Sequence, residues 1–257
     1  MIHANSHRAR CVSPGAALAA LCLLLVTACS APGPDHRPGD IFDPYEASNR
    51  INHEFNRGSD RSVARKISVG YAETVPEDLQ MTVRNFARNT AEPSHFVNNI
   101  MQLNVEGAFL NLVRFAINST LGFAGLADVA GDFGIARADT DFGQTMHFWG
   151  APEGAYLELP VIGPTTERDA IGQVVDLFTN PLSTALPAPE RYYGTGARLV
   201  SRLGDRGRFA GTVDSILHES ADSYAQTRLM YIQSRRFELG DTGEADWDDP
   251  YDMGLFD

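Results

Sequence analysis

The segment from residue 105 to residue 134 constrains the fold more than any other part of the chain. Apolar residues recur at helical spacing over its first half, which predicts an amphipathic helix. They are Val105, Ala108, Phe109, Leu112, Val113, Ala116 and Ile117. Because Leu110 and Phe115 add apolar surface beside this stripe, the helix needs cover over most of its circumference.

This apolar segment is too short to cross a bilayer. The uncharged run at residues 115–127 has 13 residues, whereas a membrane-spanning helix needs about 20 apolar residues. Gly122 and Gly125 then favour a turn or a close backbone contact over continued helix. Taken alone, the segment is typical of a core helix followed by a glycine loop, and the alternative is a lipid-facing hairpin.

The first 28 residues have the layout of a secretory signal peptide. Arg8 and Arg10 precede an apolar stretch at residues 17–26, and small residues lead to Cys29. The sequence Val-Thr-Ala-Cys resembles a bacterial lipobox, which predicts that Cys29 is lipidated and becomes the first residue of the mature chain. The alternative is an ordinary signal peptide with a chance cysteine. Cysteine occurs nowhere after Cys29, so a disulfide within the mature chain is impossible.

The charge of the predicted mature chain excludes several partners. Residues 29–257 contain 19 basic and 33 acidic residues, a net charge of −14. Such a balance argues against nucleic acid and against electrostatic adhesion to anionic lipid. Contact with a membrane must therefore be hydrophobic, through the lipid anchor or through exposed apolar side chains.

Several helices are predicted on either side of residues 105–120. Residues 29–42 form a flexible tether rich in proline and glycine. A helix is expected to begin at Asp43 as N-cap, with Pro44 in its first turn, and to end near Gly58. Further helices begin at Pro76 and Pro93. The basic residues between these helices favour a solvated face over a lipid-headgroup contact: Arg57, Arg61, Arg65 and Lys66.

The second half of the chain is predicted to be helical apart from one insert. Residues 128–164 are rich in glycine and aromatic residues, which indicates an irregular insert with an edge strand at residues 156–162 because of Pro160. Helices are expected at residues 166–178 and 212–237, with an arginine-rich segment at 191–208. Residues 238–257 form an acidic tail expected to be disordered. The fold class is therefore all-α, with a single domain at residues 43–237.

Signatures of catalysis and of metal binding are absent from the sequence. No Gly-x-Ser-x-Gly elbow, P-loop or Gly-x-Gly-x-x-Gly turn occurs. His95 and His147 stand beside aromatic residues, which favours packed or hydrogen-bonded histidines over catalytic ones. The acidic groups at residues 139–141 and 246–249 lack the full pattern of a calcium loop. We therefore predict no enzyme activity, no catalytic or metal site and no cofactor.

A series of separated motifs resembles one family. The motifs are Asp43-Pro44-Tyr45-Glu46, Asn49-Arg50, Pro76, Asn85-Phe86, Glu92-Pro93, Asn98-Asn99, Arg114-Phe115, Asn118-Ser119-Thr120-Leu121-Gly122, Gly125-Leu126-Ala127-Asp128-Val129-Ala130, Asp141-Phe142-Gly143-Gln144-Thr145, Trp149-Gly150, Leu159-Pro160, Gly163-Pro164 and Arg168-Asp169. In this order they are similar to the MlaA (VacJ) family of outer-membrane lipoproteins. The resemblance is close over residues 43–181 and looser over residues 220–237.

The resemblance implies a fold, a location and a function. Amphipathic helices would lie in the plane of the outer membrane, on its periplasmic side, and form a ring around an amphipathic channel. Phospholipids that have strayed into the outer leaflet would pass through this channel to a soluble periplasmic carrier of the MlaC type. The family also associates with trimeric porins, so the implied partners are phospholipid, a porin and the carrier.

Within this resemblance we identify candidate site residues. Channel or gate candidates lie in the glycine segment: Gly122, Phe123, Gly125, Leu126 and Phe133. Arg114 and Asn118, polar groups on a largely apolar helix, are candidate headgroup contacts. The alternative for all seven is ordinary packing. Two other functions remain open at this stage: a structural adaptor that stabilises or localises a porin, and a phospholipase.

Overall fold

The computed structural model describes residues 29–33, 36 and 39–240. The predicted signal peptide and residues 241–257 of the predicted acidic tail lie outside the described residues. The described part is a single domain, mostly helical, with one two-stranded sheet. Its elements are α2 (Glu46–Ser59), η1 (Asp60–Ala64), α3 (Arg65–Thr74), α4 (Glu77–Asn89), α5 (Glu92–Met101), α6 (Val105–Thr120), α7 (Val129–Asp132), α8 (Phe142–Phe148), β1 (Tyr156–Leu159), β2 (Gly163–Thr166), α9 (Glu167–Thr179), α10 (Pro181–Ala185), η2 (Glu190–Tyr192), α11 (Tyr193–Arg208), α12 (Ala210–Leu217) and α13 (Ser223–Glu238).

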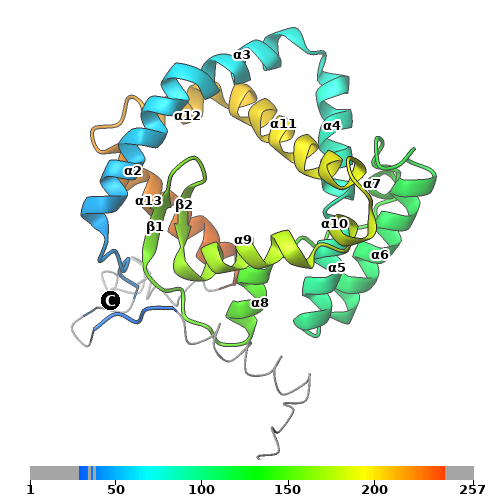
Figure 1. Ribbon diagram of the computed structural model, residues 1–257, viewed down its shortest axis with the longest axis horizontal. Helices are drawn as coiled ribbons and strands as arrows, with labels where there is room; N and C mark the ends of the chain where they lie inside the picture. Colours follow the sequence, from blue (N-terminus) through cyan, green and yellow to red (C-terminus); the bar gives the residue numbers. More distant parts are fainter. Residues whose placement is uncertain (1–28, 34–35, 37–38, 241–257) are drawn as a thin grey trace, which may run out of the picture.

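The helices follow one another around a closed outline. In the view down the shortest axis, α2, α3, α4, α5 and α9 border this outline (Figure 1). Helix α11 packs along α3 and α4, while α6 packs on α5 and α8 packs on α9. Close packing of α11 on α3 requires Gly207, because a Cβ there would overlap the carbonyl of Ser68.

Local signals explain where several helices begin. The side chain of Asn104 accepts a hydrogen bond from the Gly107 amide at 3.0 Å and caps α6. Proline stands in the first turn of α5 and of α10. The predicted helix starts at Pro76, Pro93 and Val105 are thus confirmed.

The predicted start of the first helix is wrong, whereas its predicted end near Gly58 agrees with the end of α2 at Ser59. Helix α2 begins at Glu46, because the Asp43 carboxylate instead accepts hydrogen bonds from Tyr224 and from Asn49. After its other end the chain continues through a π-helical turn into α3. Asp60 in that turn is held by Arg206 at 2.8 Å, so the junction between the two helices is fixed.

The predicted helix at residues 212–237 is divided in two. Helix α12 ends at Leu217, and α13 begins at Ser223 with Asp222 as its cap. The Asp222 side chain accepts a hydrogen bond from the Ala225 amide at 3.0 Å. A single apolar stripe runs through both helices, which is why periodicity alone did not show the break.

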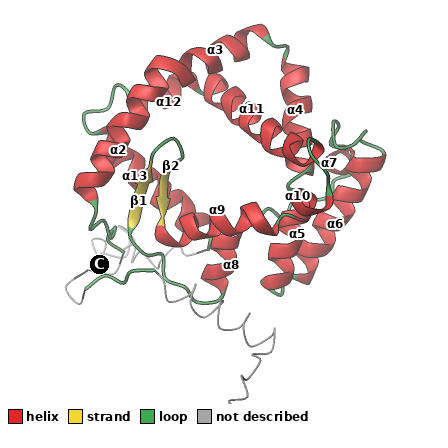
Figure 2. Ribbon diagram, in the orientation of Figure 1, coloured by secondary structure: helices red, strands yellow, loops and turns green. Residues whose placement is uncertain are grey.

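The insert at residues 128–164 is more regular than predicted. It contains the short helices α7 and α8, and β1 pairs with β2 as an antiparallel hairpin in which Tyr156 faces Thr166. Figure 2 shows these two strands in yellow, the only strands among the described residues. The predicted strand at residues 156–162 ends at Leu159, since Pro160 lies in the turn.

Asparagines of α2 cover the free edge of β1. Asn49, Asn52 and Asn56 lie on one face of the helix, and their amide groups donate to the backbone carbonyls of Tyr156, Glu158 and Leu159 at 2.8 to 3.0 Å. An uncovered strand edge leaves backbone groups unpaired. These contacts explain why the sequence of α2 is so polar.

Candidate functional site

Helix α6 turns its apolar residues outward. Val105, Phe109 and Leu112 are 72, 64 and 52% exposed. They follow one another at helical spacing and form, with Ala116 and Leu121, a surface that we call the apolar face of α6. The core-helix interpretation of this stripe is therefore wrong, because most of it is exposed.

The opposite side of α6 is polar and buried. Arg114 is 1% exposed, and its guanidinium binds Glu92 of α5 at 3.1 Å and Asp128 at 2.7 Å. Asn111 donates to the second oxygen of Glu92 at 2.8 Å and accepts from Asn99 at 2.7 Å. We call the buried residues Glu92, Asn98, Asn99, Asn111, Arg114 and Asn118 the polar spine.

The polar spine continues toward α8 and α9. The Asn98 amide donates to Asp176 at 2.9 Å, and its carbonyl accepts from the Thr145 hydroxyl at 3.0 Å. Asp176 also accepts from the Phe142 amide at 3.0 Å. Buried polar groups need such partners because an unpaired one costs about 1–3 kcal/mol. The spine therefore joins α5, α6, α8 and α9 through hydrogen bonds.

The balance of buried and exposed side chains over the described residues shows the same inversion. Among the described residues, 20 polar or charged side chains are buried against 11 hydrophobic ones, and 30 large hydrophobic side chains are exposed. Water-soluble proteins bury mostly apolar side chains, and extended exposed apolar surfaces mark contact with a membrane or a partner. No described helix is both long enough and apolar enough to cross a bilayer.

The glycine segment after α6 forms a tight loop with an unusual backbone. Phe123, Ala124 and Gly125 all have positive φ angles, of 51°, 60° and 90°. The Gly125 amide bonds to the Asn118 carbonyl at 2.7 Å, and a Cβ at Gly125 would overlap the side chain of Asn89. Non-glycine residues at positive φ cost about 1–3 kcal/mol each and persist only where the surrounding structure holds them.

The apolar gate candidates all project from this part of the chain. Phe123 is 79% exposed, and Leu126 and Phe133 are also exposed. Gly122 is buried, with no room for a side chain, since a Cβ would overlap the Ala127 carbonyl. The glycines thus shape the loop, and the three apolar side chains are its outward surface.

Arg114 and Asn118 take a different position from the one predicted. Both side chains are buried. Both donate to the Asp128 carboxylate, Arg114 at 2.7 Å and Asn118 at 2.9 Å. Asn118 also accepts from the Ala130 amide at 2.8 Å. Because these side chains are saturated by protein partners, they hold the glycine loop against α6 and are not placed to contact a headgroup.

Cys29 lies against the helical body. Its side chain is 9% exposed and packs in a cluster with Phe142, Met146 and Ala151. Burial, and then the charge of Glu167, raise the pKa of the Cys29 thiol. Next to it, the amide and hydroxyl of Ser30 both donate to Glu167, at 2.6 and 2.7 Å. The first two residues of the predicted tether, Cys29 and Ser30, are therefore bound to the helical body.

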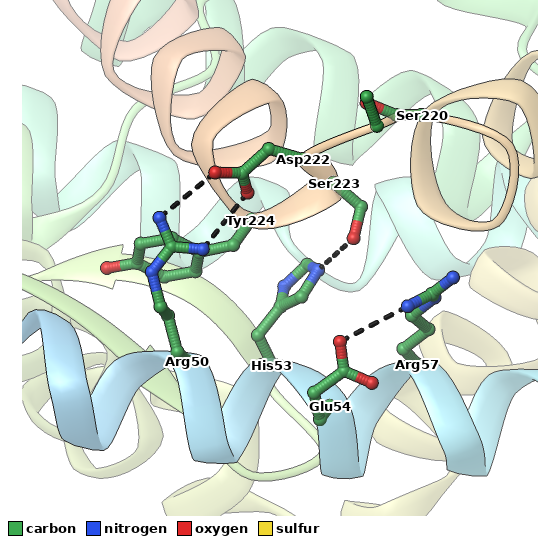
Figure 3. A pocket seen from close by; sticks show the side chains of 9 residues that line it. Arg50, His53, Glu54, Arg57, Ser220, Asp222, Ser223 and Tyr224 are labelled. Atoms are coloured by element: carbon green, nitrogen blue, oxygen red, sulfur yellow. Dashed lines mark hydrogen bonds and ion pairs between the residues drawn. The ribbon is translucent and has the colours of Figure 1, made fainter.

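One cleft in the described structure lies between α2 and the start of α13. It has a volume of about 410 Å³, and Figure 3 shows Arg50 bound to Asp222 and His53 bound to Ser223. The His53 Nε2 to Ser223 Oγ distance is 2.9 Å, and the His53 Nδ1 to Glu158 Oε1 distance is 3.5 Å.

A serine, a histidine and a carboxylate in this order can activate a nucleophile. However, His53 and Ser223 are 2 and 7% exposed, and 3.5 Å from Nδ1 to the carboxylate is too long for a good hydrogen bond. The three side chains fit a buried contact between α2, β1 and α13 better than an open active site.

One group of potential metal ligands occurs among the described residues. Asp60, Asp214 and His218 converge, but Arg206 bridges the two carboxylates at 2.8 and 2.7 Å, and Arg65 binds Asp214 at 2.7 Å. Two guanidinium groups neutralise the charge that a cation would need. The group is an ion-pair network that joins η1 to α11 and α12. Arg65 of the predicted solvated face thus has a specific partner.

His95 behaves as the sequence indicated. Its Nδ1 lies 2.6 Å from the Thr140 carbonyl, so this histidine is hydrogen-bonded.

The polar spine was not predicted from the sequence, except for its members Arg114 and Asn118. The sequence pattern that could have predicted it is the helical spacing of the polar residues at positions 111, 114 and 118, which share one face of the helix.

Comparison with known proteins gives relatives over most of the chain. An Escherichia coli protein named intermembrane phospholipid transport system lipoprotein MlaA is 30% identical over 222 residues, covering 85% of this chain and 86% of its own. A Haemophilus influenzae protein of the same name is 27% identical and covers 87 and 89%. A Rickettsia felis protein of uncharacterized function is 33% identical over 197 residues, which are 76 and 77% of the two chains.

A solved structure and a family match agree with these relatives. The structure, described as the structural basis for maintenance of bacterial outer membrane lipid asymmetry, superposes with a TM-score of 0.67 at 28% identity, and covers 77% of this chain and 98% of its own. The family match, to the MlaA lipoprotein, extends over residues 41–238. The chain belongs to the MlaA lipoprotein family.

Proposed function

We propose that this protein is an outer-membrane lipoprotein that removes misplaced phospholipids from the outer leaflet and passes them to a soluble periplasmic carrier. The observation that carries the proposal is the inverted arrangement of α5 and α6, with apolar side chains outside and the polar spine inside. A helix of this kind is stable in the plane of a membrane, where its apolar face is buried among acyl chains. The names of the Escherichia coli and Haemophilus influenzae relatives support the same role.

In this proposal the protein is held at the periplasmic side by a lipid on Cys29. The Ser30 contacts with Glu167 keep that end of the chain beside α9. Several acyl chains anchor a protein firmly because each buried methylene contributes about 0.8 kcal/mol. The apolar face of α6 then adds a second, non-covalent membrane contact.

The lipid path in this proposal passes through the ring of helices. Phe123, Leu126 and Phe133 serve as gate residues at the glycine loop, whose shape depends on Gly122 and Gly125. Support comes from their exposure and from the positive φ angles of residues 123–125, since backbone strain of this kind clusters at functional sites. A trimeric porin is proposed as the neighbour of the ring in the membrane.

Transport is tested by the level of surface-exposed phospholipid in cells deleted for the gene. We expect the wild type to restore the low level and Cys29→Ala to fail. The pair Phe109→Ser and Leu112→Ser, on the apolar face of α6, should reduce membrane association and restore asymmetry poorly. The matched control is Glu106→Ser, an exposed polar position on the same helix.

The alternative is a structural adaptor that stabilises or localises a porin. An adaptor needs no bound lipid, so phospholipid that co-purifies from mild detergent supports transport. If deletion leaves surface phospholipid unchanged while a porin is lost or misplaced, the adaptor interpretation replaces the transport proposal. Hydrolysis by the purified protein that disappears in Ser223→Ala would instead indicate a phospholipase.

A further inference from the structure

Arginines make up half of the lining of a second cleft. It has a volume of about 180 Å³ and lies between α4 and α11, bordered by α5 and the loop after α7. Its charged lining residues are Arg84, Arg88, Arg137, Arg198, Arg202 and Asp205, and His95 also borders it. We call this the arginine cleft.

The acidic groups at the arginine cleft do not neutralise it. Arg84 pairs with Asp205 at 2.9 Å, and Arg137 pairs with Asp139 at 2.8 Å. Arg88, Arg198 and Arg202 have no ion pair among the described residues, and all three are exposed. Five guanidinium groups thus face two carboxylates, Asp205 and Asp139.

The remaining acid near the cleft is already engaged. Asp176, whose charge also attracts Arg198, accepts hydrogen bonds from Asn98 and from the Phe142 amide. Partial desolvation of the guanidinium groups, and then the charges of neighbouring arginines, lower the pKa of Arg88 and of Arg198. Like charges brought this close favour a bound anion, in a chain whose residues 29–257 are otherwise strongly acidic.

The geometry of the side chains indicates which anion fits. Arg84 and Arg88 are one helical turn apart on α4, and Arg198 and Arg202 are one turn apart on α11. Two pairs of planar guanidinium groups therefore border one cleft. Guanidinium forks match the oxygens of a phosphate group better than a single ammonium does. Ala87 and Ala91 also line the cleft, which gives a small apolar surface beside the charge.

We propose that the arginine cleft binds the phosphate group of a phospholipid headgroup, through Arg88, Arg198 and Arg202. The proposal rests on the proposed function and deepens it, because it gives the headgroup a site that Arg114 and Asn118 do not provide. Free phosphate shares the same chemistry, and the apolar lining at Ala87 and Ala91 favours the lipid.

Binding is measured on the purified full-length protein in detergent. The probes are dihexanoylphosphatidylglycerol, dihexanoylglycerol without phosphate, and inorganic phosphate. We expect the phospholipid to bind best, and the triple variant Arg88→Gln, Arg198→Gln, Arg202→Gln to bind it at least about tenfold more weakly. The control variant Arg61→Gln, Lys66→Gln, Arg191→Gln removes the same charge elsewhere and should bind as the wild type does.

Each other outcome overturns the inference. Equal binding by the triple variant and the wild type shows that the cleft holds no headgroup, and inorganic phosphate binding as tightly as the phospholipid assigns the cleft to the free ion. Should the triple variant fail to fold, Arg202→Lys keeps the charge but loses the fork, and it should weaken phospholipid binding while the protein stays folded.

A test in cells separates this inference from the proposed function. If the wild type restores lipid asymmetry and the triple variant does so equally well, the arginine cleft is not on the lipid path although transport stands. If the wild type itself does not restore asymmetry, the proposed function fails whatever the cleft binds.

Discussion

Helices α6 and α8 bury mostly opposite kinds of side chain within one small domain, although Thr145 of α8 also bonds to the polar spine. Helix α8 places Phe142 and Met146 in an apolar cluster, whereas α6 places Asn111 and Arg114 in the polar spine and leaves Phe109 outside. Apolar burial is favourable when the alternative is water. This contrast is the one expected if α8 packs as in a water-soluble protein and α6, as proposed, faces lipid.

The largest expected effect comes from removing a charge in the polar spine. Glu92→Ala leaves the Arg114 guanidinium without one of its two carboxylates in a buried position, so we expect a loss of about 3–5 kcal/mol in the free energy of unfolding. Chemical denaturation in detergent measures it, with the exposed Glu106→Ala as the control at below about 1 kcal/mol. A Glu92→Ala protein as stable as the control would show that the spine does not hold α5 to α6.

The apolar cluster of α8 should respond in the usual way of a protein core. Met146 is fully buried, and Met146→Ala removes packing and leaves a cavity at a cost of about 2–5 kcal/mol. Membrane association should not change, because Met146 has no exposed surface. Weaker membrane binding by a folded Met146→Ala protein would contradict the division between the two regions.

Substitutions at two glycines, Gly125 before α7 and Gly134 after it, distinguish the cost of backbone strain from the cost of steric overlap. Gly134 has a φ of 75° with open space around it, whereas Gly125 has a φ of 90° and abuts Asn89. We expect Gly134→Ala to cost about 1–2 kcal/mol and Gly125→Ala about 2–4 kcal/mol, since overpacking adds to the strain.

The same pair of glycines tests the gate. At equal protein level in cells, Gly125→Ala should raise surface phospholipid more than Gly134→Ala does, because only Gly125 sets the path of the loop against Asn89. If neither variant alters lipid asymmetry, the gate function of this loop should be abandoned, although the difference in stability can remain.

The sequence predicted elements whose cause is local. Pro93 and the stripe from Val105 located α5 and α6, because a proline in the first turn and a helical period act within a few residues. The direction in which the stripe faces was not predictable in this way. Periodicity defines a face but not the medium that the face meets.

The remaining misses have long-range causes. Asp43 does not cap α2 because Tyr224, 181 residues away, binds its carboxylate. Arg114 was a headgroup candidate by its residue type, but its burial depends on Glu92 of α5 and on Asp128, contacts that form only in the folded chain. The helical spacing of the asparagines in α2, by contrast, could have predicted that this helix covers the edge of a strand.

The smallest effect is expected at the surface ion pairs that join α2 and α12 to the rest. Arg50 lowers the pKa of Asp222 to about 2, and Arg65 does the same for Asp214. A carboxylate with a lowered pKa stabilises the folded state above its unfolded pKa of about 3.9, and this stabilisation is lost as the pH falls toward 2. Unfolding in detergent at pH 5, 4 and 3 should show the wild type losing stability faster than Asp222→Asn, which keeps a capping side chain but no charge. Because Asp222 is half exposed, the difference in slope should be small, and equal slopes would show that this pair, unlike the polar spine, adds nothing to stability.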